Sequence, residues 1–259
     1  HPYFGYRSAS TLRLTARALR ARRSGFEPTG RWGAARTLLS QYFSHEVTGL
    51  PVTLEIEAGG RHHCFETVTD GEGFARFDLT LPEIWPLPAH AAWDVASLSW
   101  NGAHGRERVD AHILAPGADN RLAVISDIDD TIIETGVTGG LRSVARNWKR
   151  LFASLPGDRD SVPGANLFYG ALGGGTVPAA GNDEGDNHLG DRFSATRRPF
   201  FYVSSSPWNL FAYLVAFKQA KGIPLGPMML RDWGLNRDTF GSGSHGSHKV
   251  EAIKQILAT

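Results

Sequence analysis

Two carboxylates and one hydroxyl stand at alternate positions in the middle of the chain, at Asp127, Asp129 and Thr131. An aspartate can attack phosphorus and carry the phosphoryl group, and a second carboxylate can protonate the leaving alcohol and then activate water. We therefore expect Asp127 to be the nucleophile and Asp129 the acid and base. Mg²⁺ prefers hard oxygen ligands, so we expect it between Asp127, a phosphoryl oxygen and the backbone carbonyl of Asp129. The spacing predicts a phosphohydrolase, although an acidic turn at the start of a helix would contain the same residue types.

The residues before Asp127 predict the element that positions it. Leu122–Ile125 is a short, uninterrupted apolar run with β-branched residues, which is typical of a buried parallel strand. Carboxylates that follow such a strand lie at the carboxyl edge of the sheet, where open α/β folds bind their ligands. We therefore expect a ligand site at this edge.

A second predicted strand, Pro199–Val203, ends in a run of serines. Ser204 follows the strand directly, and we expect its hydroxyl to donate a hydrogen bond to a phosphoryl oxygen, helped by the amides of the next helix. Ser206 and Pro207 are typical of a helix N-cap and of the first helical position, so a helix is predicted from Ser206 to about residue 221. Helix capping alone would also explain serines at these positions. Ser206 is the better candidate for the cap, so we assign phosphate binding to Ser204.

A third predicted strand, Pro227–Leu230, precedes a final helix expected at Ser247–Leu257. Lys249 lies in the first turn of that helix, where its ammonium group could neutralise the phosphate and the charge of Asp127. A lysine at the start of a helix is more often simply solvated. The assignment of Lys249 therefore depends mainly on the order of the elements along the chain.

The two halves of the chain differ in the period of their apolar residues. Residues 119–259 alternate predicted strands and helices, which is typical of an α/β domain with a parallel sheet. Residues 1–118 alternate apolar and polar side chains at period two between frequent turn signals, which predicts a small antiparallel β-sandwich. Strands are expected at 11–19, 52–57, 63–69, 74–79, 93–100 and 108–114, helices at 141–154 and 163–172, a helix or ordered loop at 31–43, and a mobile surface loop at 173–191.

The composition excludes several classes of protein. Of 259 residues, 41% are hydrophobic and 20% charged, which is typical of a globular protein, and the net charge of +1 gives no overall attraction to nucleic acid. No apolar segment is long enough to span a bilayer, so we expect a cytoplasmic protein or one peripheral to a membrane. The single cysteine, Cys64, excludes an intrachain disulfide. His62 and His63 beside it could suggest zinc, but a half-buried strand is favoured.

Four segments, in this order, resemble the haloacid dehalogenase-like phosphatases, and more closely the actin-patch-associated phosphatidate phosphatase family and its bacterial relatives. They are ISDIDDTI at 125–132, YVSSSPWNL at 202–210, GPMMLRDWG at 226–234 and HK at 248–249. The resemblance implies a haloacid dehalogenase-like, Rossmann-like fold for 119–259, with Mg²⁺ held by Asp127 and Asp129. It implies that Thr131, Ser204 and Lys249 bind the phosphate. It further implies a phospholipid substrate at a membrane surface, phosphatidate, cleaved to diacylglycerol and phosphate.

One part of the family pattern is absent from this sequence. Members continue after the last helix with another strand and an acidic GDSG-type motif that supplies a further Mg²⁺ ligand, whereas this sequence ends at Thr259. We therefore expect it to be a fragment of a longer protein, with a truncated catalytic domain. The absent strand would pair beside Leu122–Ser126, which is expected to be an apolar sheet edge.

Three functions follow from these patterns. The leading prediction is a Mg²⁺-dependent phosphatidate phosphatase that acts through an aspartyl-phosphate. The second keeps this mechanism with a soluble phosphomonoester as the substrate. The third is a non-catalytic lipid- or protein-binding module with a relic phosphatase fold, which the absent acidic motif favours and the intact set of Asp127, Asp129 and Thr131 disfavours.

Overall fold

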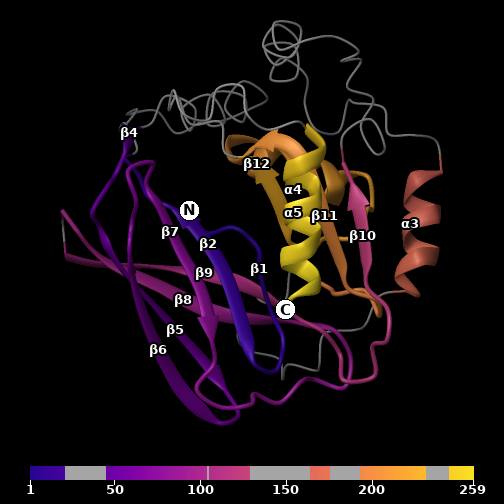
Figure 1. Cartoon of the computed structure of the whole chain (residues 1–259), viewed down its shortest axis with the longest axis horizontal. Helices are drawn as coiled ribbons and strands as arrows, with labels where there is room; N and C mark the ends of the chain where they lie inside the picture. Colours follow the sequence, from indigo (N-terminus) through magenta and orange to yellow (C-terminus); the bar gives the residue numbers. More distant parts are fainter. Residues whose placement is uncertain (21–44, 104, 129–163, 176–192, 232–244) are drawn as a thin grey trace, which may run out of the picture.

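The chain forms two main sheets that lie side by side, with helices packed around the smaller one (Figure 1). The structure is a computed structural model that describes residues 1–20, 45–103, 105–128, 164–175, 193–231 and 245–259. The chain passes from the large sheet to the small one between Ala115 and Val124. In these described ranges, no helix is long and apolar enough to cross a membrane. The division of the chain into domains at 118 and 119 stays a prediction.

The large sheet has seven strands in the order β6-β5-β8-β9-β1-β2-β7. Their bounds are β1 Gly5–Arg7, β2 Thr11–Arg17, β5 Pro51–Ala58, β6 Arg61–Val68, β7 Phe74–Thr80, β8 Ala92–Gly102 and β9 Gly105–Ala115. A separate short pair consists of β3 Leu19–Arg20 and β4 His45–Glu46. The two edge strands β6 and β7 contact each other, so the sheet curls around one apolar core. The strands predicted from period-two alternation are thereby confirmed.

The predicted antiparallel pairing is confirmed for most of this sheet and is wrong for one pair. β1 runs parallel to β9, with Gly5 opposite Ile113, so the sheet is mixed. β1 has only three residues, which is too short for an alternating pattern to reveal it. Its Gly5 is packed so closely that a Cβ there would lie 2.7 Å from the carbonyl oxygen of Arg13. The strands also form one continuous sheet rather than the two sheets of the predicted sandwich.

The small sheet is parallel and has the order β10-β11-β12. Its strands are β10 Val124–Asp127, β11 Phe200–Pro207 and β12 Met228–Arg231, and the helices are α3 Ala165–Gly173, α4 Phe211–Ala220 and α5 His245–Leu257. These elements confirm the three strands predicted from apolar runs, the helix predicted at 163–172 and the final helix. Among the described strands, β10 lies at an edge of the sheet. The elements predicted at 31–43 and 141–154, and most of the loop at 173–191, lie outside the described residues, and the complete haloacid dehalogenase-like fold stays a prediction.

The helix predicted from Ser206 begins later than expected. β11 continues through the serines to Pro207, a 3₁₀ turn follows at Trp208–Leu210, and α4 starts at Phe211. Ser206 is therefore not a helix cap, and that prediction is wrong. Pro207 is extended, with φ −74° and ψ 157°, and it pairs with Arg231 of β12. Because a residue before proline is biased away from the helical region, Ser206 stays in the strand.

Side chains of the large sheet complete the apolar packing of the small one. Tyr3 and Phe74 belong to the same buried cluster as residues of α4 and β12. Tyr6 packs edge-on against Phe201 of β11, with 5.3 Å between ring centroids, in a second cluster that includes residues of α5. The two sheets therefore share their cores rather than meeting through a polar interface.

The outer face of β2 and β7 is the surface that faces the small sheet. On β2 the apolar residues point into the core of the large sheet, and the alternate residues point outward. The outward residues are Arg13, Thr15 and Arg17 of β2, opposite Asp78, Arg76 and Phe74 of β7. This face therefore combines cations with one buried aromatic ring.

A lysine of α4 lies inside the core of the small sheet. Lys218 is only 1% exposed, and its Nζ lies 3.2 Å from the centroid of the Tyr202 ring. Nζ has no hydrogen-bond partner among the described residues. Burial lowers the pKa of Lys218 well below its usual value and raises that of Tyr202 well above its own. The packing of α4 thus favours the neutral amine.

Candidate active site at the carboxyl edge of the parallel sheet

The strand register brings predicted site residues of β10 and β11 to one edge. Asp127 ends β10 and lies opposite Val203 of β11, and Val203 lies opposite Met229 of β12. Ser204 is the next residue along β11. Parallel strands end at the same edge of a sheet, and neighbours are about 4.8 Å apart. Asp127 and Ser204 therefore stand on adjacent strands at the carboxyl edge.

Helix α5 places Lys249 against Asp127. The helix packs on the small sheet through Ala252 and Ile256, which are buried in one cluster with Val203. Its second turn carries Lys249, whose Nζ donates a hydrogen bond of 2.6 Å to Oδ2 of Asp127. The two side chains remain accessible, 28% and 37% exposed. A charge-assisted hydrogen bond this short orients the carboxylate and offsets its charge, while solvent or a ligand can still reach both groups.

Ser204 lies at the predicted place, but its surroundings differ from those expected. The residue is fully buried, and its Oγ accepts a hydrogen bond of 2.9 Å from the backbone N–H of Ser206. Ser205 and Ser206, the next two residues, are half-buried. Ser204 thus stabilises the irregular part of β11 between Val203 and Pro207, where the strand register shifts. Its contact with phosphate stays a prediction.

The other predicted residues of the acidic segment, Asp129 and Thr131, lie outside the described residues. In the parts of the chain that the structure describes, no three His, Cys, Asp or Glu side chains form a cluster that could hold a metal ion. Mg²⁺ does not need such a cluster, because proteins commonly bind it through one or two carboxylates together with substrate phosphates and water. The accessible carboxylate of Asp127 fits that requirement. His62, His63 and Cys64 lie in strand β6, as the strand interpretation predicted.

A tyrosine that the sequence did not indicate completes the support of Asp127. Ser126 Oγ donates a hydrogen bond of 2.9 Å to the backbone carbonyl of Asp127, and the hydroxyl oxygen of Tyr169 lies 2.6 Å from the same Oγ. Ser126 has a single hydroxyl hydrogen, so Tyr169 is the donor in the second contact. Burial raises the pKa of Tyr169, and the negative charge of Asp127 adds to this shift. Tyr169 therefore keeps its proton and can support the end of β10.

The large sheet holds the residues that follow the serines of β11. Nη1 of Arg17 donates a hydrogen bond of 2.7 Å to Oδ1 of Asn209, and the guanidinium carbon lies 4.7 Å from the ring centroid of Phe74. Tyr3 packs against Trp208, with 4.4 Å between ring centroids. The Trp-Asn pair of the segment YVSSSPWNL is thus an anchor for strand β2 and the N-terminal segment.

Removing this anchor is expected to lower the free energy of unfolding. A hydrogen bond with a charged donor contributes about 1.5–3 kcal/mol, so we expect Asn209→Ala to cost that amount. Arg17→Ala should cost more, because Arg17 also donates to the backbone carbonyl of Glu72 and to Glu46. The double variant should cost less than the sum of the two, because each single change already removes the shared contact. Urea denaturation of the four proteins measures this coupling. Arg20→Ala, at an exposed arginine of β3, is the matched control, and strictly additive losses would contradict the assigned contact.

The comparisons with known proteins cover the half of the chain that contains this edge. Residues 122–259 match the family described as phosphatidate phosphatase APP1, catalytic domain. Over 138 residues, or 52% of this chain, the sequence is 33% identical to phosphatidate phosphatase APP1 of Saccharomyces cerevisiae (strain ATCC 204508 / S288c). The matched segment covers 19% of the yeast protein. The resemblance inferred from the four segments is thereby confirmed: the chain belongs to the phosphatidate phosphatase APP1 catalytic-domain family.

Proposed function

We propose that the protein is a Mg²⁺-dependent phosphatidate phosphatase that acts at a membrane surface and releases diacylglycerol and phosphate. Two lines of support meet at the same residues. The family match includes the whole acidic segment. The described part of that segment places Asp127 at the carboxyl edge, where Lys249 donates a hydrogen bond to its carboxylate. The observation that carries the proposal is the contact of 2.6 Å between Lys249 and Asp127, because it joins a nucleophile and a cation at an accessible ligand edge.

In the proposed reaction, Asp127 forms the covalent intermediate. A carboxylate oxygen of Asp127 bonds to phosphorus while the bond between phosphorus and the glycerol oxygen breaks. Asp129 gives its proton to the leaving oxygen, which departs as the hydroxyl of diacylglycerol. Asp129 then takes a proton from water as the water oxygen attacks phosphorus, and inorganic phosphate leaves as Asp127 is restored. Each step therefore balances with water as the second reactant.

The remaining residues bind charge and hold geometry. Lys249 keeps Asp127 oriented in the free protein and would share its ammonium group with a phosphoryl oxygen in the complex. Thr131 and Ser204 are proposed to donate hydrogen bonds to the phosphate, and the Tyr169–Ser126 pair keeps the Asp127 backbone in place. Asp127 and Asp129 would hold Mg²⁺, which when bound neutralises charge on the phosphoryl oxygens.

We expect the protein to release phosphate from phosphatidate dispersed in phosphatidylcholine vesicles, and to do so only when Mg²⁺ is present. The reason is that a phosphate monoester brings two negative charges to an edge that already holds carboxylates. Colorimetric phosphate release, with and without EDTA and with Mg²⁺ added back, measures the effect. Equal rates with and without the chelator would contradict the metal requirement.

The choice of substrate also separates the proposal from its rivals. Release from glucose 6-phosphate or glycerol 3-phosphate at the same rate as from phosphatidate would indicate a phosphatase of soluble monoesters. Vesicle binding in a sedimentation assay with no release from either kind of substrate would indicate a binding module.

A further inference from the structure

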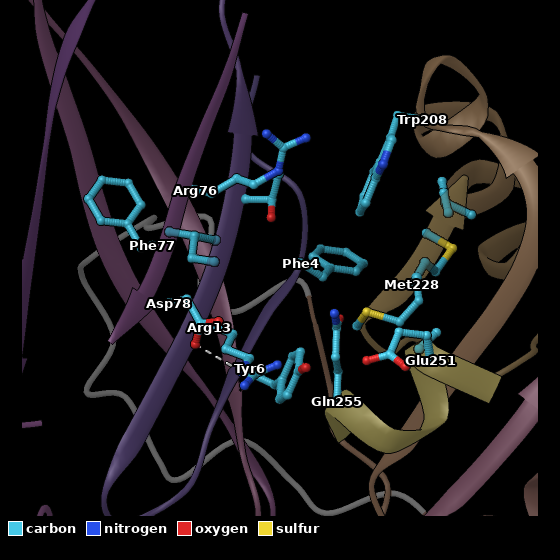
Figure 2. A pocket seen from close by; sticks show the side chains of 15 residues that line it. Phe4, Tyr6, Arg13, Arg76, Phe77, Asp78, Trp208, Met228, Glu251 and Gln255 are labelled. Atoms are coloured by element: carbon cyan, nitrogen blue, oxygen red, sulfur yellow. Dashed lines mark ion pairs between the residues drawn. The ribbon is translucent and has the colours of Figure 1, made fainter. Parts of the chain in front are cut away.

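A cleft lies between the two sheets (Figure 2). One wall is the outer face of β2 and β7, and the other consists of β12, Trp208 and helix α5. Phe4 and Trp208 project into the cleft, and Gln255 lies at its far end from Trp208 (Figure 2). The cleft has a volume of about 270 Å³. An apolar cavity of about 150 Å³ can hold benzene, so this space is large enough for a hydrocarbon chain of several carbons.

The interior of the cleft suits a flexible apolar ligand. Its lining includes the rings of Phe4 and Trp208 and the thioethers of Met228 and Met229. Methionine side chains are unbranched and polarisable, so they adapt to ligands of variable shape. Aromatic rings add large apolar surfaces. This lining fits a saturated or unsaturated alkyl chain better than a rigid polar molecule.

The charges around the cleft are already balanced, so they do not make it a phosphate site. Nε of Arg13 lies 3.1 Å from Oδ1 of Asp78, and Arg76 forms an ion pair with Asp70. Glu251 of α5 adds a further negative charge to the lining. An anion that entered here would meet carboxylates as well as guanidinium groups. The neutral part of an amphiphile is therefore the favoured occupant, and its phosphate would lie elsewhere.

The cleft and the candidate active site are both built on the small sheet and helix α5. Met229 of the cleft lies opposite Val203, which lies opposite Asp127. Two strand spacings separate Met229 from Asp127, which is about 10 Å between their backbones. The glycerol unit and the first carbons of an acyl chain can span this distance. Helix α5 also borders both, because it carries Lys249 at the site and Gln255 in the cleft.

We propose that this cleft binds one acyl chain of the phospholipid whose phosphate is cleaved at Asp127. The inference rests on the proposed function and adds the subsite that recognises the lipid part of the substrate. The chain would enter beside Trp208 and extend along β12 toward Gln255. Burial of each methylene would tighten binding about fourfold, the equivalent of ~0.8 kcal/mol, until the cleft is full.

The test uses probes without phosphate, so that it does not depend on catalysis. Binding of 1-monoacylglycerols with acyl chains of increasing length to the protein is measured by calorimetry, below their critical micelle concentrations. We expect affinity to rise about fourfold per methylene over the shorter chains. Absent binding, or an affinity that does not change with chain length, would overturn the proposal. An affinity independent of chain length is also the result expected if the natural occupant of the cleft were an extended peptide along β12.

Variants that fill the cleft from opposite walls locate the binding. Gln255→Trp on α5 and Thr15→Trp on β2 place an indole in the cleft, and each should remove most of the dependence on chain length. Lys254→Trp is the matched control, because Lys254 is an exposed neighbour that does not line the cleft. Thermal unfolding of each variant verifies that it is folded, and two walls keep the test valid if one variant is not. Unchanged dependence on chain length in a folded filling variant would overturn the proposal, whereas failure to release phosphate from any lipid would count only against the proposed function.

Discussion

Replacing Asp127 by asparagine is expected to reduce phosphate release by about 10⁴-fold or more, the scale reached when the nucleophile of a hydrolase is removed. An amide is a far weaker nucleophile than a carboxylate, and it offers Lys249 a neutral oxygen in place of the charged one. We expect Asp129→Asn to abolish release as well, because the leaving oxygen would lose its proton donor. Initial rates on phosphatidate vesicles at saturating Mg²⁺ measure both effects.

A matched control separates lost chemistry from lost folding. Asp119→Asn changes an exposed aspartate that lies just before β10, and it should leave the rate unchanged. The ion pair of Asp127 is accessible, so its loss should cost about 1 kcal/mol or less of stability, and Asp127→Asn should unfold at nearly the same temperature as the parent. Full activity in a folded Asp127→Asn protein would rule out Asp127 as the nucleophile.

The second large effect concerns stability. Lys218→Met is expected to raise the free energy of unfolding by at least about 1–3 kcal/mol at neutral pH, because an unsatisfied buried polar group costs that much and a charged one more. Methionine has a similar length and no group that needs a hydrogen bond, so it can fill the same space beside Tyr202. Denaturation in urea measures the gain. Lys254→Met, at a surface lysine, should change stability by less than about 0.5 kcal/mol.

The same lysine is expected to make stability depend on pH. Burial lowers the pKa of Lys218 in the folded protein, whereas the unfolded chain has the ordinary value near 10.4. Between these two pKa values the unfolded state binds one proton more, so the free energy of unfolding rises with pH in this window, by up to ~1.4 kcal/mol per unit. Below the folded pKa both states carry the proton, so the free energy of unfolding no longer changes with pH through this group. The cost of burying the ammonium group is then at its largest. Tyr202, which faces the amine, has a raised pKa and stays neutral in this range. The difference between Lys218→Met and the parent should therefore shrink as pH increases; a constant difference would contradict the lowered pKa.

The elements that position the site could be predicted because a parallel sheet leaves a strong trace in sequence. Strands of a parallel sheet appear as continuous apolar runs, as in the buried β11 and the half-buried β10, and parallel strands must end at one edge. Once Asp127 and Ser204 were placed at strand ends, their proximity followed from topology. Lys249 needed in addition the order of elements along the chain, because a single lysine at a helix start carries no signal of its own.

The contacts that could not be predicted connect residues far apart in the chain. Tyr169 and Ser126 are 43 positions apart, and Arg17 and Asn209 are 192 apart. Neither pair has a spacing that distinguishes it from ordinary polar residues. Lys218 was hidden for a different reason: most sides of α4 are buried, including Phe211, Leu214 and Phe217, so a lysine that would normally mark the solvent face marks the interior instead. Predicting the late start of α4 would have required knowing that Pro207 pairs with Arg231 of β12.

The shared packing of the two sheets affects how the protein can be divided. The family match begins at residue 122, which would invite excision of 122–259 as a minimal catalytic piece. Such a piece would lose Tyr3, Tyr6 and Phe74, whose rings are buried in clusters with the small sheet and its helices. It would therefore present aromatic surface to water and tend to self-associate. For this chain, the smallest soluble catalyst is expected to include the N-terminal strands, however little of the chemistry they perform.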